Sequence, residues 1–342
     1  MAASFYNMYQ EVAIMNQLKK KNNWSAYLYI LPLMVLSFAL IYYCIICTVG
    51  TSFTDWNGMS KEMNFVGLKN YTKMLHDKTF WTAVANNVIF FFGTVFIQAA
   101  LGFLLAVLLK NRLPGSNLFK AIYFMPIAMA TSIITAIFRI LMDPTNGALN
   151  TFLRAAGLNA FAVSWLGDPR YALLSVIIVN IFQWMGFSMI IYYAGLMSLP
   201  DDVYEAARID GAGFWRTTLS ITFPMVKGTT NVLIILGIVG SLKTFDIVKL
   251  LTGGGPGRSS TVLNTYLYEK AFKDFNAGGA ASIGVAILMI AVIMSFLCRL
   301  PRYLTKPRQR RSEWDMAGSD GISRVSAVFR GKLLLTNKIR II

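Results

Sequence analysis

The stretch YALLSVIIVNIFQWMGFSMIIYYAGLMSLP, residues 171–200, contains no Asp, Glu, Lys or Arg. About 20 uncharged residues are enough for a helix to cross the roughly 30 Å hydrocarbon layer of a bilayer. Apolar side chains occur on nearly every face of this run, which suits a helix surrounded by lipid or by other helices better than a helix with one face in water. The stretch therefore predicts a transmembrane helix.

Five other runs lack the same four residue types. They cover residues 22–54, 79–109, 121–138, 228–242 and 275–298. The run 228–242 is the shortest and lies between Lys227 and Lys243. Both ammonium groups are therefore expected near the membrane edges, or Lys243 lines a water-filled cavity. The six runs together predict an all-α, polytopic membrane protein with six transmembrane helices.

The composition of the whole chain agrees with this class. Of the 342 residues, 56% are hydrophobic and only 14% are charged, whereas soluble domains carry roughly 25% charged residues. A soluble enzyme is therefore nearly excluded. The net charge of +16 would suit nucleic acid, but no aromatic platform or reading helix accompanies the basic residues. We expect no nucleic acid partner, and anionic membrane lipids are the expected partner of the basic residues after the last span.

An even number of spans places both chain ends on one side of the membrane. Lys and Arg are more frequent in the terminal segments and the connections on that side, which predicts cytoplasmic termini. This excess depends on residues 299–342 and reverses without them. The expected organisation is a cytoplasmic N-terminal segment at 1–26, a six-span membrane domain at 27–300 and a basic cytoplasmic tail at 301–342.

Residues for covalent chemistry are sparse. The chain has no G-x-x-x-x-G-K-S/T phosphate loop, and its one histidine, His76, stands in a polar connection without a nucleophile motif. Cys44 and Cys47 lie inside a predicted span, where a thiol behaves as a small apolar group. We therefore expect no catalytic, cofactor-binding or metal site in this chain and do not expect an enzyme.

The connection LPDDVYEAARIDGAGFWRTTLSITFP, residues 199–224, has an unusual internal pattern. Pro200 followed by two aspartates predicts the first turn of a short helix, where carboxylates complement the helix dipole. Gly211 and Gly213 predict a reversal through positive φ. A second short helix is expected over 214–221.

This connection resembles the E-A-A loop of the permease subunits of binding-protein-dependent ABC importers. The pattern is E-A-A, three residues, G, nine residues, I, one residue, L-P, and the matching positions are Glu205, Ala206, Ala207, Gly211, Ile221 and Pro224, with Phe223 in place of Leu. Two further segments, LLTGGGP at 250–256 and GLKNY at 67–71, are similar to segments of carbohydrate-uptake permeases such as those of the maltose and glycerol-phosphate importers. The resemblance covers roughly residues 25–300 and favours the first of two permease subunits.

The resemblance implies a type I ABC importer permease fold and a place in the bacterial cytoplasmic (inner) membrane. The chain would take up a carbohydrate, an oligosaccharide by preference, delivered by an extracytoplasmic binding protein. Its implied partners are a second permease of a different chain and two ATPase subunits that carry ATP and Mg. These subunits would grip the E-A-A helices of the two permeases, which lie in the loop 197–224 of this chain. The residues expected to couple the chain to the ATPases are Glu205, Ala206, Ala207, Asp210, Gly211, Ala212, Phe214, Ile221 and Pro224.

Polar groups within spans predict the substrate path, because such groups are costly unless they face a cavity or a partner. The candidates are Asn180, Gln183, Trp184, Ser188, Asn231, Ser241, Lys243, Thr244 and Asp246. The first three share one helical face by their spacing, and amides and an indole suit sugar hydroxyls and sugar faces. Hydrogen bonds between helices are the alternative role. Lys243 and Asp246 would pair with each other or contact an acidic sugar.

Two other classes of protein compete with an importer permease. An ATP-independent secondary transporter or channel commonly has carboxylates in the membrane or broken helices in repeated halves, and no span centre here contains Asp or Glu. A structural or lipid-binding membrane protein is the third possibility. Within the importer class, oligosaccharide, monosaccharide and glycerol-phosphate remain open as the solute.

Overall fold

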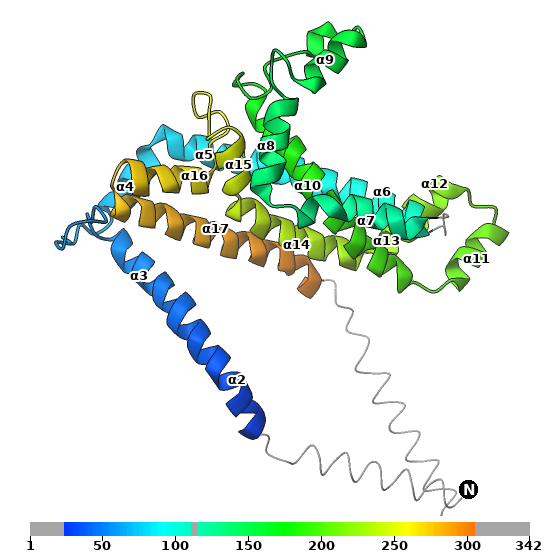
Figure 1. The fold of residues 1–342 in the computed structure, drawn as a ribbon. Coiled ribbons are helices and arrows are strands. Elements are labelled where there is room, and N and C mark those ends of the chain that lie inside the picture. Colours follow the sequence, from blue (N-terminus) through cyan, green and yellow to red (C-terminus); the bar gives the residue numbers. More distant parts are fainter. Residues whose placement is uncertain (1–23, 111–114, 305–342) are drawn as a thin grey trace, which may run out of the picture. The chain divides into compact units, whose positions relative to one another are not determined.

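The structure, a computed structural model, describes residues 24–110 and 115–304. The described chain is helical and has a single isolated bridge, between Thr54 and Phe65, and no strand (Figure 1). Most of the terminal segments predicted at 1–26 and 301–342 lies outside the described residues, which leave out 1–23 and 305–342. Two units divide the chain, at 1–291 and 292–342. The second is described only as the C-terminal end of one helix.

Within residues 24–110 and 115–304, four helical segments are long and apolar enough to cross a membrane. They are α2 (Trp24–Ser37) with η1 (Phe38–Tyr42) and α3 (Tyr43–Ser52); α5 (Lys78–Phe91) with η2 (Phe92–Phe96) and α6 (Ile97–Lys110); α10 (Ala172–Met197); and α17 (Ala277–Leu304). These segments coincide with the runs at 22–54, 79–109, 171–200 and 275–298, so four of the predicted spans form as long helices.

The other two predicted spans belong to bent helix pairs. The first pair is α7 (Ser116–Ala128) and α8 (Thr131–Leu141), bent by 96°. The second joins α12 (Phe214–Arg216), η4 (Thr217–Thr222) and α13 (Phe223–Met225) to α14 (Lys227–Lys243), bent by 68°. When each pair is counted as one span, the total is six, as predicted.

The third predicted span differs from a simple helix in a way that the charge-free run did not reveal. Its run, 121–138, contains the 96° break. Met129 and Ala130 are extended there, with ψ of 144° and 138°. Pro126 stands in the last turn of α7, where it offers no N–H to the preceding turn. The residues before and after the break are equally apolar, so the composition of the run does not reveal it.

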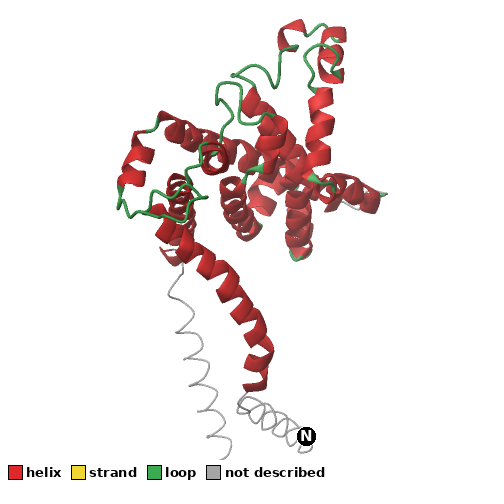
Figure 2. Cartoon of the chain, turned by 60° about the vertical axis from the view of Figure 1, so that its left-hand side comes forward, coloured by secondary structure: helices red, strands yellow, loops and turns green. Residues whose placement is uncertain are grey.

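Short helices fill the connections. They are α4 (Lys69–His76), α9 (Ala148–Ala155), η3 (Asn159–Phe161), α11 (Asp202–Ile209), α15 (Asp246–Leu251), α16 (Leu263–Tyr268) and η5 (Glu269–Lys273). Figure 2 shows these pieces and the loops between them around the longer helices.

Helix α10 packs against α6 and α14 and approaches α7 closely. One apolar cluster joins Phe103 of α6, Tyr192 of α10 and Leu233 of α14. Backbone approach is closest at Gly186 of α10, where a Cβ atom would lie 1.9 Å from the carbonyl oxygen of Tyr123 on α7. Small residues permit this kind of close packing between membrane helices. The packing places the polar side chains of α10 beside α6, α8 and α14.

The GLKNY segment has a structural role at the end of α3. The Asn70 amide is buried and donates hydrogen bonds to the carbonyl oxygens of Ser52 at 2.9 Å and Thr54 at 2.7 Å. The Tyr71 hydroxyl lies 2.7 Å from the Ser52 hydroxyl. These bonds satisfy carbonyls that the end of α3 leaves free.

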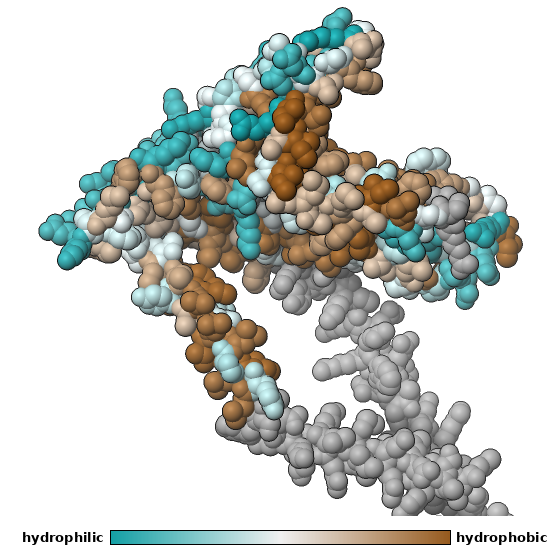
Figure 3. Space-filling view, viewed as in Figure 1, coloured by the Kyte–Doolittle hydropathy of each residue, from teal (hydrophilic) through white to brown (hydrophobic). Residues whose placement is uncertain are grey.

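Apolar side chains remain exposed along α2 and α3 and on α8 (Figure 3). The most apolar window of residues 27–52 contains no buried residue. On α8, Ile140 is 74% exposed. A surface of this kind matches lipid hydrocarbon or apolar partners rather than water.

Candidate functional site

The E-A-A segment forms a bent pair of helices at one end of α10 and α14. Helix α11 has Asp202 and Glu205 in its first turn, where their charges complement the helix dipole. It ends at Ile209, and Gly211, two residues further on, has a left-handed φ of +70°, as predicted. Gly213 instead has φ −67° and ψ 168°, so the expectation of positive φ is wrong there. A single left-handed residue is enough to reverse the chain.

Some of the residues predicted to contact the ATPases lie on the exposed side of these two short helices. Glu205, Ala206, Asp210, Gly211, Phe214 and Pro224 are exposed, Ala212 and Ile221 are half-buried, and Ala207 is buried. Ala207 is only 4% exposed, so it holds α11 against the chain itself and does not face outward. Ile209, which was not among the predicted residues, is 87% exposed.

The second arm is longer than expected. Instead of ending at 221, it continues as α12, η4 and α13 through Met225. The wide turn of η4 directly precedes Pro224, which has no N–H for an ordinary helical bond. The Thr222 hydroxyl donates to the carbonyl oxygen of Thr217 at 3.0 Å. The arm therefore leads without a loop to the bend before α14.

A lysine that was not predicted joins α11 to two spans. Lys110 is the last residue of α6. Its Nζ donates to the Leu196 carbonyl oxygen of α10 at 3.2 Å and lies 3.8 Å from the ring centroid of Tyr204 on α11. The Tyr204 hydroxyl is buried and has no hydrogen-bond partner among the described residues. A lysine at the end of an apolar run was visible in the sequence, but its partners were not.

A cavity of about 510 Å³, in which polar side chains are set into a mainly apolar lining, lies among α5, η2 and α6, α8, α10, and α14 with α15. It gathers all of the predicted path residues except Asn231: Asn180, Gln183, Trp184, Ser188, Ser241, Lys243, Thr244 and Asp246. Thr94, Gln98 and Thr131 also line it and were not predicted. Each of them is a polar side chain within an apolar run, the same feature that marks Gln183. Thr94 and Gln98 lie in the run 79–109, and Thr131 lies in the run 121–138.

Two amides of the cavity are tied to neighbouring helices. The Nε2 atom of Gln98 donates to Asn180 Oδ1 at 2.8 Å, and the Nε2 atom of Gln183 donates to the Thr131 hydroxyl at 3.1 Å. Asn180 and Gln183 thus make interhelical hydrogen bonds and line the cavity at the same time. Trp184 is 42% exposed and is one of the residues that line the cavity.

Lys243 and Asp246 form no ion pair with each other in the described structure. The pairing role predicted for them is therefore wrong here. Helix α14 ends at Lys243, Thr244 is extended with ψ 121°, and α15 begins only at Asp246. The helical spacing that would bring the two side chains together is lost at this break. Lys243 is exposed at the cavity wall, which agrees with the cavity alternative for this lysine.

Within residues 24–110 and 115–304, no group of three or more His, Cys, Asp or Glu side chains is arranged to hold a metal ion. Cys44 and Cys47 are free and exposed on α3.

A polytopic helical chain with a cavity between spans and a bent helical loop at one end defines a membrane transport permease. The chain belongs to the family of inner membrane components of binding-protein-dependent transport systems, whose profile matches residues 98–300. The recognition of this family from the E-A-A loop is confirmed, and it is favoured over the ATP-independent transporter or channel.

Related proteins cover most of the chain. The probable ABC transporter permease protein YurN of Bacillus subtilis is 35% identical over 81% of this chain and 95% of its own length. The trehalose/maltose transport system permease protein MalF of Thermococcus litoralis is 32% identical over 82% of this chain and 95% of its own. A bacterial ABC transporter that imports the acidic polysaccharide alginate has a chain with a TM-score of 0.71 and 22% identity, covering 86% of this chain and 100% of that one. This last likeness shows the shared fold.

Proposed function

We propose that the chain is the permease subunit of an ATP-driven importer that takes up a carbohydrate handed over by an extracytoplasmic binding protein. The observation that carries this proposal is the cavity among the spans, where amides and hydroxyls are set into a mainly apolar lining. Its amides and hydroxyls suit sugar hydroxyls, and the exposed ring of Trp184 suits the apolar face of a sugar. The relative named for trehalose/maltose transport supports the same class of solute, with an oligosaccharide as the preferred substrate.

The importer is proposed to contain two ATPase subunits, which would hold the ATP and Mg, and the loop at 197–224 is proposed to receive their motion on this permease. Exposed Glu205 can accept charge-assisted hydrogen bonds from an ATPase. Ala206 is small and exposed, which allows close approach. The junction at Lys110 would carry a displacement of α11 to α6 and α10. A second permease of a different chain would complete the translocation path.

This arrangement implies a bacterial cytoplasmic membrane with both termini of the chain on the cytoplasmic side. The E-A-A loop would then face the cytoplasm, and the opposite ends of α10 and α14 would face the binding protein.

The test is uptake of labelled carbohydrate into proteoliposomes that contain the complete importer, with ATP inside and the binding protein outside. The double substitution of Gln183→Ala and Trp184→Ala should raise the half-saturating carbohydrate concentration about tenfold or more, because it removes one hydrogen-bonding and one stacking group. Asn231→Ala is the matched control, since Asn231 is a polar residue of α14 outside the cavity lining.

Two outcomes would contradict the proposal. Uptake that proceeds without ATP would remove the importer assignment. Equal transport parameters for the double variant and the Asn231→Ala control would remove the cavity from the substrate path.

A further inference from the structure

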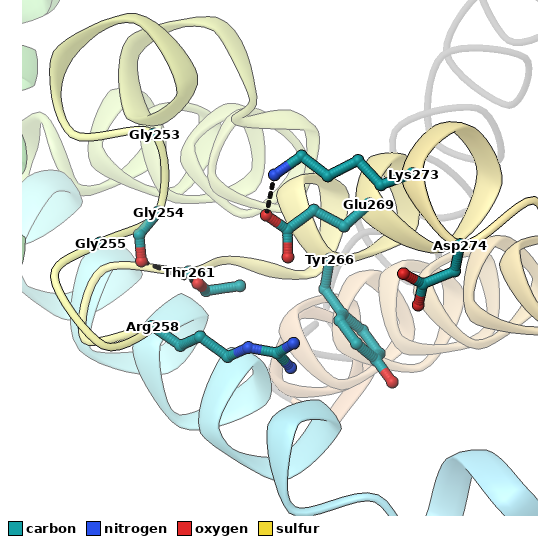
Figure 4. A pocket seen from close by; sticks show the side chains of 9 residues that line it. All are labelled: Gly253, Gly254, Gly255, Arg258, Thr261, Tyr266, Glu269, Lys273 and Asp274. Carbon is teal, nitrogen blue, oxygen red and sulfur yellow. Dashed lines mark hydrogen bonds and ion pairs between the residues drawn. The ribbon is translucent and has the colours of Figure 1, made fainter.

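A second pocket, of about 270 Å³, lies at the end of α14 opposite the E-A-A loop. Its walls come from the glycine loop 253–255, from Arg258 and Thr261 that follow it, and from Tyr266 and the charged side chains of η5 (Figure 4). None of these residues lines the cavity among the spans. We call this pocket the glycine-loop socket.

The wall of the socket is held by hydrogen bonds. The Thr261 hydroxyl donates to the Gly254 carbonyl oxygen at 2.8 Å, and the Ser260 hydroxyl donates to the Gly255 carbonyl oxygen at 2.7 Å. Asn86 of α5 donates to the carbonyl oxygen of Thr261 at 2.9 Å. Gly254 has φ +90°, and a Cβ atom there would lie 2.9 Å from the Thr261 hydroxyl. These hydrogen bonds and the close approach at Gly254 hold the loop in the conformation seen here.

The charges around the socket are balanced except for one. Lys273 pairs with Glu269 at 3.0 Å, and Lys270 pairs with Asp274 at 3.0 Å. Arg258 has no carboxylate partner among the described residues. Its guanidinium extends from the loop into the socket (Figure 4) and donates to the Thr79 hydroxyl at the start of α5. A guanidinium has five N–H donors, so donors remain for another group.

The nearby carboxylate of Asp77 is already engaged. It accepts hydrogen bonds from the Tyr266 hydroxyl and from the Thr79 backbone N–H. Arg258 is exposed and has φ +67°. The structure thus presents one oriented cation that is free to meet a carboxylate from outside the chain.

We propose that the glycine-loop socket receives an acidic side chain of the extracytoplasmic binding protein, which pairs with Arg258. This proposal rests on the proposed function, because it requires that partner. Guanidinium and carboxylate groups match in a two-pronged geometry. The small volume suits one side chain, since pockets for whole small molecules usually span about 300–1,000 Å³. The separation from the cavity among the spans argues against a site for the acidic group of a transported sugar.

The experiment measures ATP hydrolysis by the complete importer in nanodiscs as a function of binding-protein concentration. Arg258→Gln keeps an N–H donor for Thr79 and removes the charge, and Arg258→Glu reverses the charge. We expect the half-saturating concentration of binding protein to rise roughly tenfold for Arg258→Gln and further for Arg258→Glu. The salt dependence of this concentration should weaken in Arg258→Gln, because the screened ion pair is gone.

Arg170→Glu is the matched control. Arg170 is an exposed arginine in another connection and pairs with Asp168 of this chain at 2.9 Å. Its charge reversal changes the net charge of the chain as much as Arg258→Glu does, and it should move the half-saturating concentration less than about twofold.

Three outcomes would overturn the proposal while the wild-type importer still responds to its binding protein. The first is an unchanged half-saturating concentration in both Arg258 variants. The second is a lower maximal rate at an unchanged half-saturating concentration, which would mean that Arg258 only stabilises the fold. The third is a defect seen only with acidic sugars. A wild-type complex that shows no response to any binding protein would instead count against the proposed function.

Discussion

The junction at Lys110 allows a quantitative prediction about energy coupling. The ammonium group donates to the Leu196 carbonyl oxygen at 3.2 Å and lies 3.8 Å from the Tyr204 ring centroid. A hydrogen bond from a charged donor contributes about 1.5–3 kcal/mol, and a cation–π contact contributes about 0.5–2 kcal/mol. Because Lys110 is half-buried, the lower ends apply, which gives about 2 kcal/mol.

Lys110→Met keeps the length of the side chain and removes both interactions. The hydrogen bond to Leu196 joins α6 to α10, so only the cation–π contact with Tyr204 holds α11. A loss of about 0.5 kcal/mol changes the equilibrium between α11 held against the spans and α11 released by about twofold. We therefore expect ATP hydrolysis to continue while the carbohydrate taken up per ATP hydrolysed falls about twofold. Lys110→Arg retains a cation and should keep most of the coupling.

The assay measures phosphate release and carbohydrate uptake in the same proteoliposomes. Lys120→Met is the matched control, because Lys120 of α7 is also half-buried and lies 3.9 Å from the ring centroid of Tyr193 on α10. That variant removes a contact of the same kind without touching α11. The reasoning is refuted if Lys110→Met keeps the wild-type ratio of uptake to hydrolysis, or if Lys120→Met lowers the ratio equally.

Two further predictions concern stability. Gly186→Ala should lower the unfolding temperature in detergent and reduce the free energy of unfolding by about 1–3 kcal/mol or more, because the new Cβ would lie 1.9 Å from the Tyr123 carbonyl oxygen. Gly240→Ala is the control, since a Cβ at Gly240 would have no atom within 4 Å and should leave the unfolding temperature unchanged. Equal stabilities of the two variants would contradict the close packing at Gly186. At Asp77, burial raises the pKa, but hydrogen bonds from Tyr266 and Thr79 outweigh it and hold the pKa below its ordinary value of 3.8. The resulting stability is complete above that value and is lost as the pH falls below it, so Asp77→Asn should flatten the acid limb of thermal stability against pH, and an unchanged limb would contradict this cause.

The spans and the coupling turn follow from local properties of the chain. The run 171–200 becomes α10, because a long uncharged segment is stable in hydrocarbon only with its backbone bonded internally. The reversal after α11 follows from Gly211, since a left-handed residue has little steric cost without a Cβ.

Other features were outside the reach of a sequence pattern. The break at Met129 and Ala130 lies in a run whose composition is apolar throughout. Ala206 and Ala207 are identical in type, but only the first is exposed, because the packing of α11 decides which side faces the chain. Lys243 and Asp246 stand three apart, yet the end of α14 separates them.

By itself, the sequence determined the membrane class, the positions of most spans and the family to which the chain belongs. The tertiary structure alone decided which polar groups meet, as in the bond between Gln98 and Asn180, which are 82 positions apart. Burial in lipid and backbone preference are properties of a residue and its near neighbours. A contact between distant residues depends instead on how whole helices pack, and the neighbouring residues do not encode that packing.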